Sequence, residues 1–151
     1  MFASLLNQLL GREAAPDALP GEAAEQALAA LLVRVARADG HYDDDERAHL
    51  LQIIASRNGF SPTDAEVFLA EAEAAEARAA DTVSFTRDIK AGIPLDERAQ
   101  VLRAMWSLAL ADANRDPDED QILRLTAGLL GLTDRDSALA RQQAAADLGL
   151  A

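Results

Sequence analysis

The sequence contains no cysteine, which excludes a disulfide framework, a thiolate nucleophile and any zinc or iron–sulfur site built on cysteine. Histidine is scarce, and the chain has no serine nucleophile elbow, no glycine-rich phosphate loop and no HExxH motif. Aromatic residues make up only 4% of the chain, so little predicts the dry cleft that acid/base work by paired carboxylates needs. We therefore expect a protein without enzymatic activity.

Basic residues are also few, with 14 Lys and Arg against 26 Asp and Glu, which gives a formal net charge of -12. Such a chain repels phosphate backbones, so we expect no nucleic-acid partner, and adhesion to an anionic membrane is disfavoured. The sequence lacks any uninterrupted apolar run near the roughly 18 residues that a membrane-spanning helix needs. We expect a cytoplasmic protein.

The first residues repeat apolar side chains at helical spacing between Phe2 and Leu10, with no Lys or Arg before them. This pattern does not fit an export signal. It favours a short helix that packs on the domain or forms a mobile arm, while peripheral contact with a membrane or partner stays open. Residues 1–20 then form this helix and a linker rich in Pro and Gly, and residues 21–151 form one domain.

What the chain does contain is apolar residues at intervals of three and four, a pattern typical of amphipathic helices. Helix-start residues such as Ser61 and helix-stop glycines such as Gly59 divide the pattern. The sequence thus predicts an all-α fold of seven to eight helices, the last seven beginning and ending near residues 22–38, 43–58, 62–80, 82–91, 96–111 and 116–131, and from 133 onward.

The two halves of the domain are similar to each other at a shift of 73 residues. Ala36, Ala38 and Asp39 align with Ala109, Ala111 and Asp112. The helix stop and cap Gly59-Phe60-Ser61 align with Gly131-Leu132-Thr133 at a shift of 72 residues. The domain is therefore predicted to be a duplicated helical unit.

Ten of the 26 acidic residues lie in two equivalent interhelical segments, DGHYDDDE at 39–46 and DANRDPDED at 112–120. Clustered carboxylates repel one another unless something neutralises them, and hard oxygen ligands suit Ca²⁺ or Mg²⁺. The hypothesis of a divalent cation site names six ligands, Asp39, Asp43 and Glu46 from the first segment and Asp112, Asp116 and Glu119 from the second.

Helix capping explains part of the same pattern without a metal. Asp43 with Glu46, and Asp116 with Glu119, each place an acid at a helix start and a Glu three residues later. An EF-hand is excluded, because its sixth position, a glycine in true loops, is Pro117 here. His41 is interpreted as a loop residue and His49 as lying on the exposed side of its helix.

Four stretches of the sequence carry a family resemblance: ARADGHYDDDE, ALADANRDPDED, SFTRDIKAGIPLDERAQVLRAMWSLALAD and LLGLTDRDS. They resemble the TerB family of bacterial tellurite-resistance proteins, which is related to the N-terminal domain of the DjlA membrane co-chaperone. The resemblance covers roughly residues 21–145 and implies a pseudo-twofold helical bundle whose acidic loops lie together as a cation or partner site. Asp39, Glu46, Asp112 and Glu119 fall on the family's acidic positions. One departure is Ala113, which stands where the family typically has glycine.

The resemblance implies a stress-response or envelope-associated setting. We expect the partner to be another protein. We interpret Phe85, Met105 and Trp106 as core residues between the two halves. Two functional hypotheses follow: a non-catalytic module that binds a divalent cation or a partner through its acidic loops, or a metal-free interaction domain that recognises basic partner segments. The sequence gives no indication of the oligomeric state.

Overall fold

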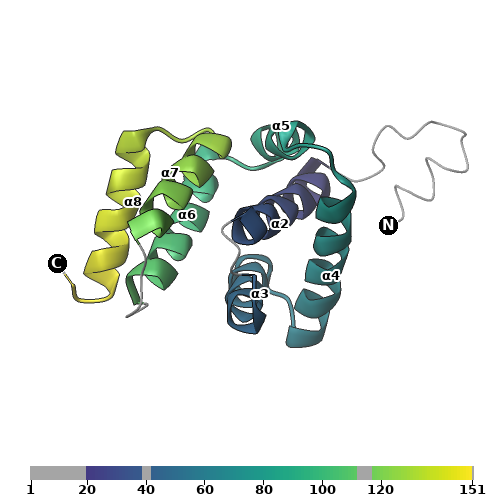
Figure 1. Cartoon of the computed structure of the whole chain (residues 1–151), viewed down its shortest axis with the longest axis horizontal. Coiled ribbons are helices and arrows are strands. Elements are labelled where there is room, and N and C mark those ends of the chain that lie inside the picture. Colours follow the sequence, from purple (N-terminus) through teal and green to yellow (C-terminus); the bar gives the residue numbers. More distant parts are fainter. Residues whose placement is uncertain (1–19, 39–41, 112–116, 151) are drawn as a thin grey trace, which may run out of the picture.

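The computed structural model describes residues 20–38, 42–111 and 117–150, with the backbone alone at residue 20 and residues 117–119. Every regular element in these ranges is an α-helix, as predicted. The helix predicted between Phe2 and Leu10 lies outside the described residues. In chain order the helices are α2 (Pro20–Ala38), α3 (Asp44–Asn58), α4 (Pro62–Arg78), α5 (Val83–Gly92), α6 (Leu95–Ala111), α7 (Pro117–Leu129) and α8 (Asp134–Asp147) (Figure 1).

The same corner follows α3 and α7. Gly59 and Gly131 are left-handed, with φ of 68° and 77°, a conformation that glycine adopts without steric cost. The amide after each glycine donates to the carbonyl five residues earlier, at 3.1 and 2.8 Å. The hydroxyls of Ser61 and Thr133 then accept from the amide three residues on, at 3.1 and 3.0 Å, and cap the next helix. Both predicted helix stops and both predicted caps are confirmed.

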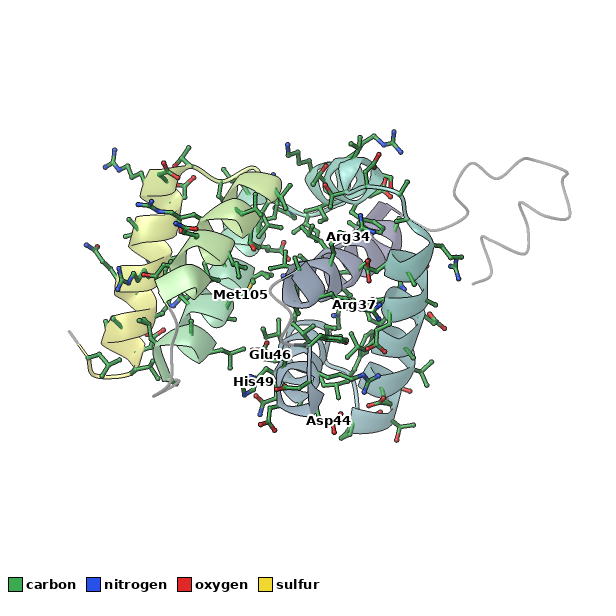
Figure 2. The ribbon with its side chains drawn as sticks, in the orientation of Figure 1. Arg34, Arg37, Asp44, Glu46, His49 and Met105 are labelled. Carbon is green, nitrogen blue, oxygen red and sulfur yellow. The ribbon has the colours of Figure 1, made fainter. Side chains whose placement is uncertain are left out.

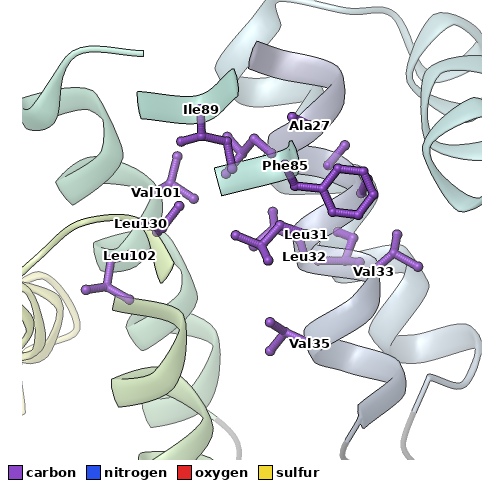
Figure 3. Packing of buried hydrophobic residues seen from close by; sticks show 14 of the residues in the cluster. Ala27, Leu31, Leu32, Val33, Val35, Phe85, Ile89, Val101, Leu102 and Leu130 are labelled. Atoms are coloured by element: carbon purple, nitrogen blue, oxygen red, sulfur yellow. The ribbon is translucent and has the colours of Figure 1, made fainter. Parts of the chain in front are cut away.

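Helix α2 is the central helix because it is apolar around nearly its whole circumference, and residues 27–33 are all buried. It packs against α5, α4 and α3. Alanines at positions such as 24, 27 and 30 let the neighbouring helices approach closely. Figure 3 shows Phe85 of α5 beside this helix, and the core continuing through Ile89 to Val101 and Leu130 of the C-terminal half.

The C-terminal half repeats the packing of the N-terminal half. Helix α6 packs on α8 and α7, and α7 packs on α8, just as α2 packs on α4 and α3, and α3 packs on α4. These are the pairs that the 73-residue shift equates, so the packing agrees with the predicted duplication. Helix α5 lies between the two units in sequence and packs on α2. Among the described helices it has no counterpart in the second unit.

The interpretation of Phe85, Met105 and Trp106 as one set between the halves is wrong for two of them. Phe85 is buried, but it belongs to the N-terminal half beside α2. Trp106 is buried in the C-terminal half, where its Nε1 donates to Ser137 Oγ of α8 at 3.3 Å. Only Met105 lies at the junction. Periodicity marks a side chain as buried, but it does not say which neighbouring helix covers it.

None of the helices described is both long enough and apolar enough to cross a lipid bilayer.

Candidate functional site at the junction of the two repeats

The first acidic segment is described from Tyr42 onward. Asp43 caps α3, because its Oδ1 accepts from the backbone N of Glu46 at 2.9 Å. The capping interpretation is therefore confirmed for Asp43. Asp44 and Asp45 in the first turn of α3 are exposed, while Glu46 is half-buried.

Four of the six predicted cation ligands lie where the structure gives no side-chain position. Asp39, Asp112 and Asp116 lie outside the described residues, and of Glu119 in α7 only the backbone is described. Among the side chains described, no group of three Asp, Glu or His could hold a metal ion. The cation hypothesis therefore stays a prediction.

A groove separates the two halves on the side where α3 faces α6. It has a volume of about 110 Å³ and is lined by α2 and α3 on one wall and by α6 and α7 on the other. Ten of its lining residues form five pairs that the 73-residue shift equates: Leu32 with Met105, Val35 with Leu108, Ala36 with Ala109, His49 with Ile122 and Leu50 with Leu123. The groove is thus the surface on which the two repeats face each other with equivalent residues.

Among the described residues of the lining, Glu46 and His49 have polar side chains and the others are apolar. Figure 2 shows both on the side of α3 that faces the C-terminal half, with Met105 of α6 pointing toward the same space. His49 is half-buried there, so the expectation that it lies on the exposed side of its helix is wrong. Glu46 brings the acidic start of α3 to the edge of the groove.

An ionic cluster on the opposite side of α3 fixes this helix to α4. Arg47 donates from Nε and Nη2 to the carboxylate of Glu73, both at 3.0 Å, and its Nη1 lies 2.5 Å from Glu66 Oε1. The Tyr42 hydroxyl also donates to Glu73. The hydrogen bond from Arg47 holds the pKa of Glu73 below its usual range, while burial and then the Glu73 carboxylate raise the pKa of Tyr42. This cluster positions the first turn of α3.

Two arginines in the last turns of α2 fix the chain just before the acidic segment. Arg34 donates to the Glu76 carboxylate at 3.1 Å and to the carbonyl of Ala79 at 2.7 Å, where α4 ends and carbonyls lack helical partners. Arg37 pairs with the other oxygen of Glu76 at 3.2 Å, and its guanidinium lies 5.4 Å from the centre of the Tyr42 ring. Figure 2 shows Arg37 on the side of α2 toward α4.

Sequence reasoning missed these arginine–glutamate pairs, because their partners lie 19 to 42 residues apart and no local pattern connects them. The groove had a signal, since Leu32 and Val35, and likewise Met105 and Leu108, lie on the apolar stripes of equivalent helices. Comparing the two stripes position by position would have indicated a shared surface.

A larger cavity of about 810 Å³ lies elsewhere, between the start of α2, α4 and α5. Phe60, Phe68 and Phe85 line it, together with carboxylates such as Glu71. Its lining includes Gly21 at the start of α2, and no described residue of either acidic segment or of the C-terminal half lines it. The larger cavity is thus separate from the junction.

The sequence was compared with protein families, curated proteins and solved structures. The family described as "Tellurite resistance protein TerB" matches residues 25–142, which is more than three quarters of the chain. No curated protein and no solved structure matches the sequence significantly. The matched range begins in α2 and ends in α8, so it contains both repeats, the groove and both acidic segments. The chain therefore belongs to the TerB family of tellurite resistance proteins.

Proposed function

We propose that this TerB-family chain is a non-catalytic binding module that takes a basic segment of a partner protein at the junction of its two repeats. The observation that carries the proposal is the groove, whose walls are equivalent positions of the two repeats and whose edge holds Glu46 from the acidic start of α3. Acidic side chains beside an apolar surface favour a partner with the opposite charge.

The local charges support a basic partner over an acidic one. Asp44 and Asp45 are exposed next to the groove residue Glu46, and the chain has a net charge of -12. The arginines that flank this segment in the sequence, Arg37 and Arg47, pair with glutamates of α4. The exposed carboxylates of Asp44 and Asp45 would therefore steer a cationic segment toward the groove.

Fluorescence anisotropy with two labelled peptides of scrambled sequence, one rich in lysine and one rich in glutamate, tests this proposal. We expect the basic peptide alone to bind, and more weakly as salt rises, since screening acts on exposed charges. The variant Asp44→Asn/Asp45→Asn should weaken binding several-fold while leaving the Asp43 cap intact. Glu71→Gln/Asp96→Asn removes two exposed acids elsewhere and is the matched control. Equal weakening by both variants would contradict the proposal, because net charge alone would then explain the binding.

The divalent cation hypothesis is tested separately. Calorimetry with Ca²⁺, Mg²⁺ and Mn²⁺ on the wild type and on Asp39→Asn/Asp112→Asn measures the cation directly. If the acidic segments form a site, one cation raises the Tm of the wild type at concentrations too low for screening, and the variant loses this rise. Absence of binding at millimolar cation, with equal Tm shifts at matched ionic strength, would contradict the cation hypothesis and leave the partner proposal intact.

A further inference from the structure

The size of the junction groove argues against a small-molecule ligand. Sites for drug-sized ligands enclose roughly 300–1,000 Å³. The groove has a volume of about 110 Å³, which suffices for a few apolar side chains of a larger partner. Its walls are formed mainly by aliphatic side chains from four helices, with Met105 and Leu108 half-buried on one wall and Ile53 half-buried on the other.

The lining also restricts the conformation of the partner. An extended segment that adds a strand needs an exposed sheet edge, and the described residues form helices alone. A polyproline segment docks into aromatic-lined grooves, and none of the described residues that line this one is aromatic. The remaining common mode is a helix that lays its apolar face into a hydrophobic groove.

We propose that the junction groove binds an amphipathic helix of a partner protein, with apolar side chains at i, i+3 or i+4 in the groove and basic side chains directed to the start of α3. This inference rests on the proposed function and names the class of its partner. Charge complementarity selects the occupant. The polar groove residue nearest the start of α3 is Glu46, and the neighbouring Asp44 and Asp45 are exposed, so the helix carries lysine or arginine beside its apolar stripe.

Two labelled peptides of about 18 residues, or five helical turns, separate the inference from the proposed function. Both contain leucine and lysine in the same numbers, one with leucine at helical spacing and the other with strict alternation. We expect the helical peptide to bind at least about tenfold more tightly and to gain helical circular dichroism on binding, because its leucines enter the groove.

Variants that alter the groove test the same point from the protein side. Ala109→Trp fills the groove, and Ile53→Gln makes one wall polar. Both should remove the preference for the helical peptide while the alternating peptide still binds. Ala138→Trp, on an exposed position of α8 that does not line the groove, is the matched control and should keep the preference. Thermal unfolding of each variant verifies that it folds.

The outcomes are distinguishable. If both peptides bind equally well to the wild type, the helical inference is overturned and the proposed charge recognition stands. If neither peptide binds, the proposed function fails as well. If the wild type instead forms a concentration-dependent dimer in sedimentation that Ala109→Trp abolishes, the groove binds a second copy of this chain, and the inference of a partner helix is overturned.

Discussion

Gly131 must be glycine for two reasons, its left-handed backbone and the close approach of Arg98. Its φ of 77° disfavours any side chain, and a Cβ at this position would lie 2.8 Å from Arg98 Nη1. Arg98 is held there because it donates to the carbonyl of Leu130 at 2.6 Å and to that of Ile93 at 3.0 Å. We predict that Gly131→Ala lowers the free energy of unfolding by about 2–3 kcal/mol, since backbone strain adds to the loss of a charged hydrogen bond. Urea denaturation measures this change.

Gly59 is the matched control, because it has a φ of 68° and a Cβ added there would meet nothing within 4 Å. Gly59→Ala should lower the free energy of unfolding by about 1 kcal/mol, because only the backbone strain acts there. The excess cost at Gly131 should disappear when both substitutions are measured in an Arg98→Ala background. Equal costs at the two glycines in the wild type would show that Arg98 exerts no steric effect.

The chemistry of single residues could be predicted from the sequence wherever it is local. Ser61, Thr133 and Asp43 cap their helices through bonds to amides three residues away, and such bonds depend on little besides the local sequence. The role of Arg98 could not be predicted. It connects the end of α5 to the end of α7, and only the tertiary fold brings these two carbonyls together.

Among the elements, the packing of α3 on α4 depends on pH through Glu73. The hydrogen bond from Arg47 lowers the pKa of this carboxyl in the folded protein, so the unfolded chain binds the proton more readily. The resulting stabilisation is present above the ordinary glutamate pKa of about 4.3 and is lost as pH falls through the lower pKa of the folded state. We predict that Glu73→Gln costs about 1–2 kcal/mol at neutral pH, and that this cost shrinks steadily below about pH 4. Urea unfolding of both proteins across this pH range measures it.

Glu66 provides the control, since it pairs with the same Arg47 but its side chain is 52% exposed, against 19% for Glu73. Glu66→Gln should change the stability by less than about 0.5 kcal/mol at any pH. A cost for Glu73→Gln that stays constant down to pH 3 would show that ionisation of this residue does not stabilise the fold.

Helix positions could be predicted well, and helix neighbours less well. Apolar periodicity and the stops at Gly59 and Gly131 place the helix ends within a few residues of those observed. The covering partners of Phe85 and Trp106 were predicted wrongly, because burial on a stripe is compatible with several packings. Helix α5 lies outside the repeat pattern, so the internal similarity contains no information about its packing on α2.

For the whole molecule, Arg57 of α3 connects the two halves. It donates to Glu25 of α2 at 2.6 Å and to Glu97 of α6 at 3.1 Å. Burial acts to lower the pKa of Arg57, but hydrogen bonds to both glutamates outweigh it, so the net pKa is raised. We predict that Arg57→Met lowers the free energy of unfolding by about 2 kcal/mol, because Glu25 then keeps a partly buried charge without this partner. Urea denaturation gives the value.

Arg103→Met is the comparison within one half. Arg103 pairs with Asp147 of α8, and both side chains are more exposed, at 39% and 47%, than Arg57 and Glu25, at 14% and 21%. Its removal should cost at most about 1 kcal/mol. If Arg57→Met and Arg103→Met lower the free energy of unfolding by similar amounts, burial of the Arg57–Glu25 pair does not increase its stabilising effect.

The candidate site at the junction could be predicted only in part. The sequence indicated that two acidic segments are equivalent, and the structure brings Glu46 from one of them to the groove. The groove itself arises from how the repeats are oriented, with equivalent residues such as Val35 and Leu108 on opposite walls. That orientation is a long-range property, and the repeat pattern does not specify it.

Equivalent walls also have a consequence for the direction of a bound chain. When the same patch of two copies meets itself, the copies are related by an approximate half-turn, as in an isologous dimer. A helix rotated by that half-turn would meet nearly the same surface, so the aliphatic pairs barely discriminate between its two polarities. Discrimination then depends on positions where the repeats differ, above all His49 opposite Ile122 and Ile53, whose counterpart Thr126 is fully buried. If the groove binds a helix, we therefore expect His49 and Ile53 to determine its polarity.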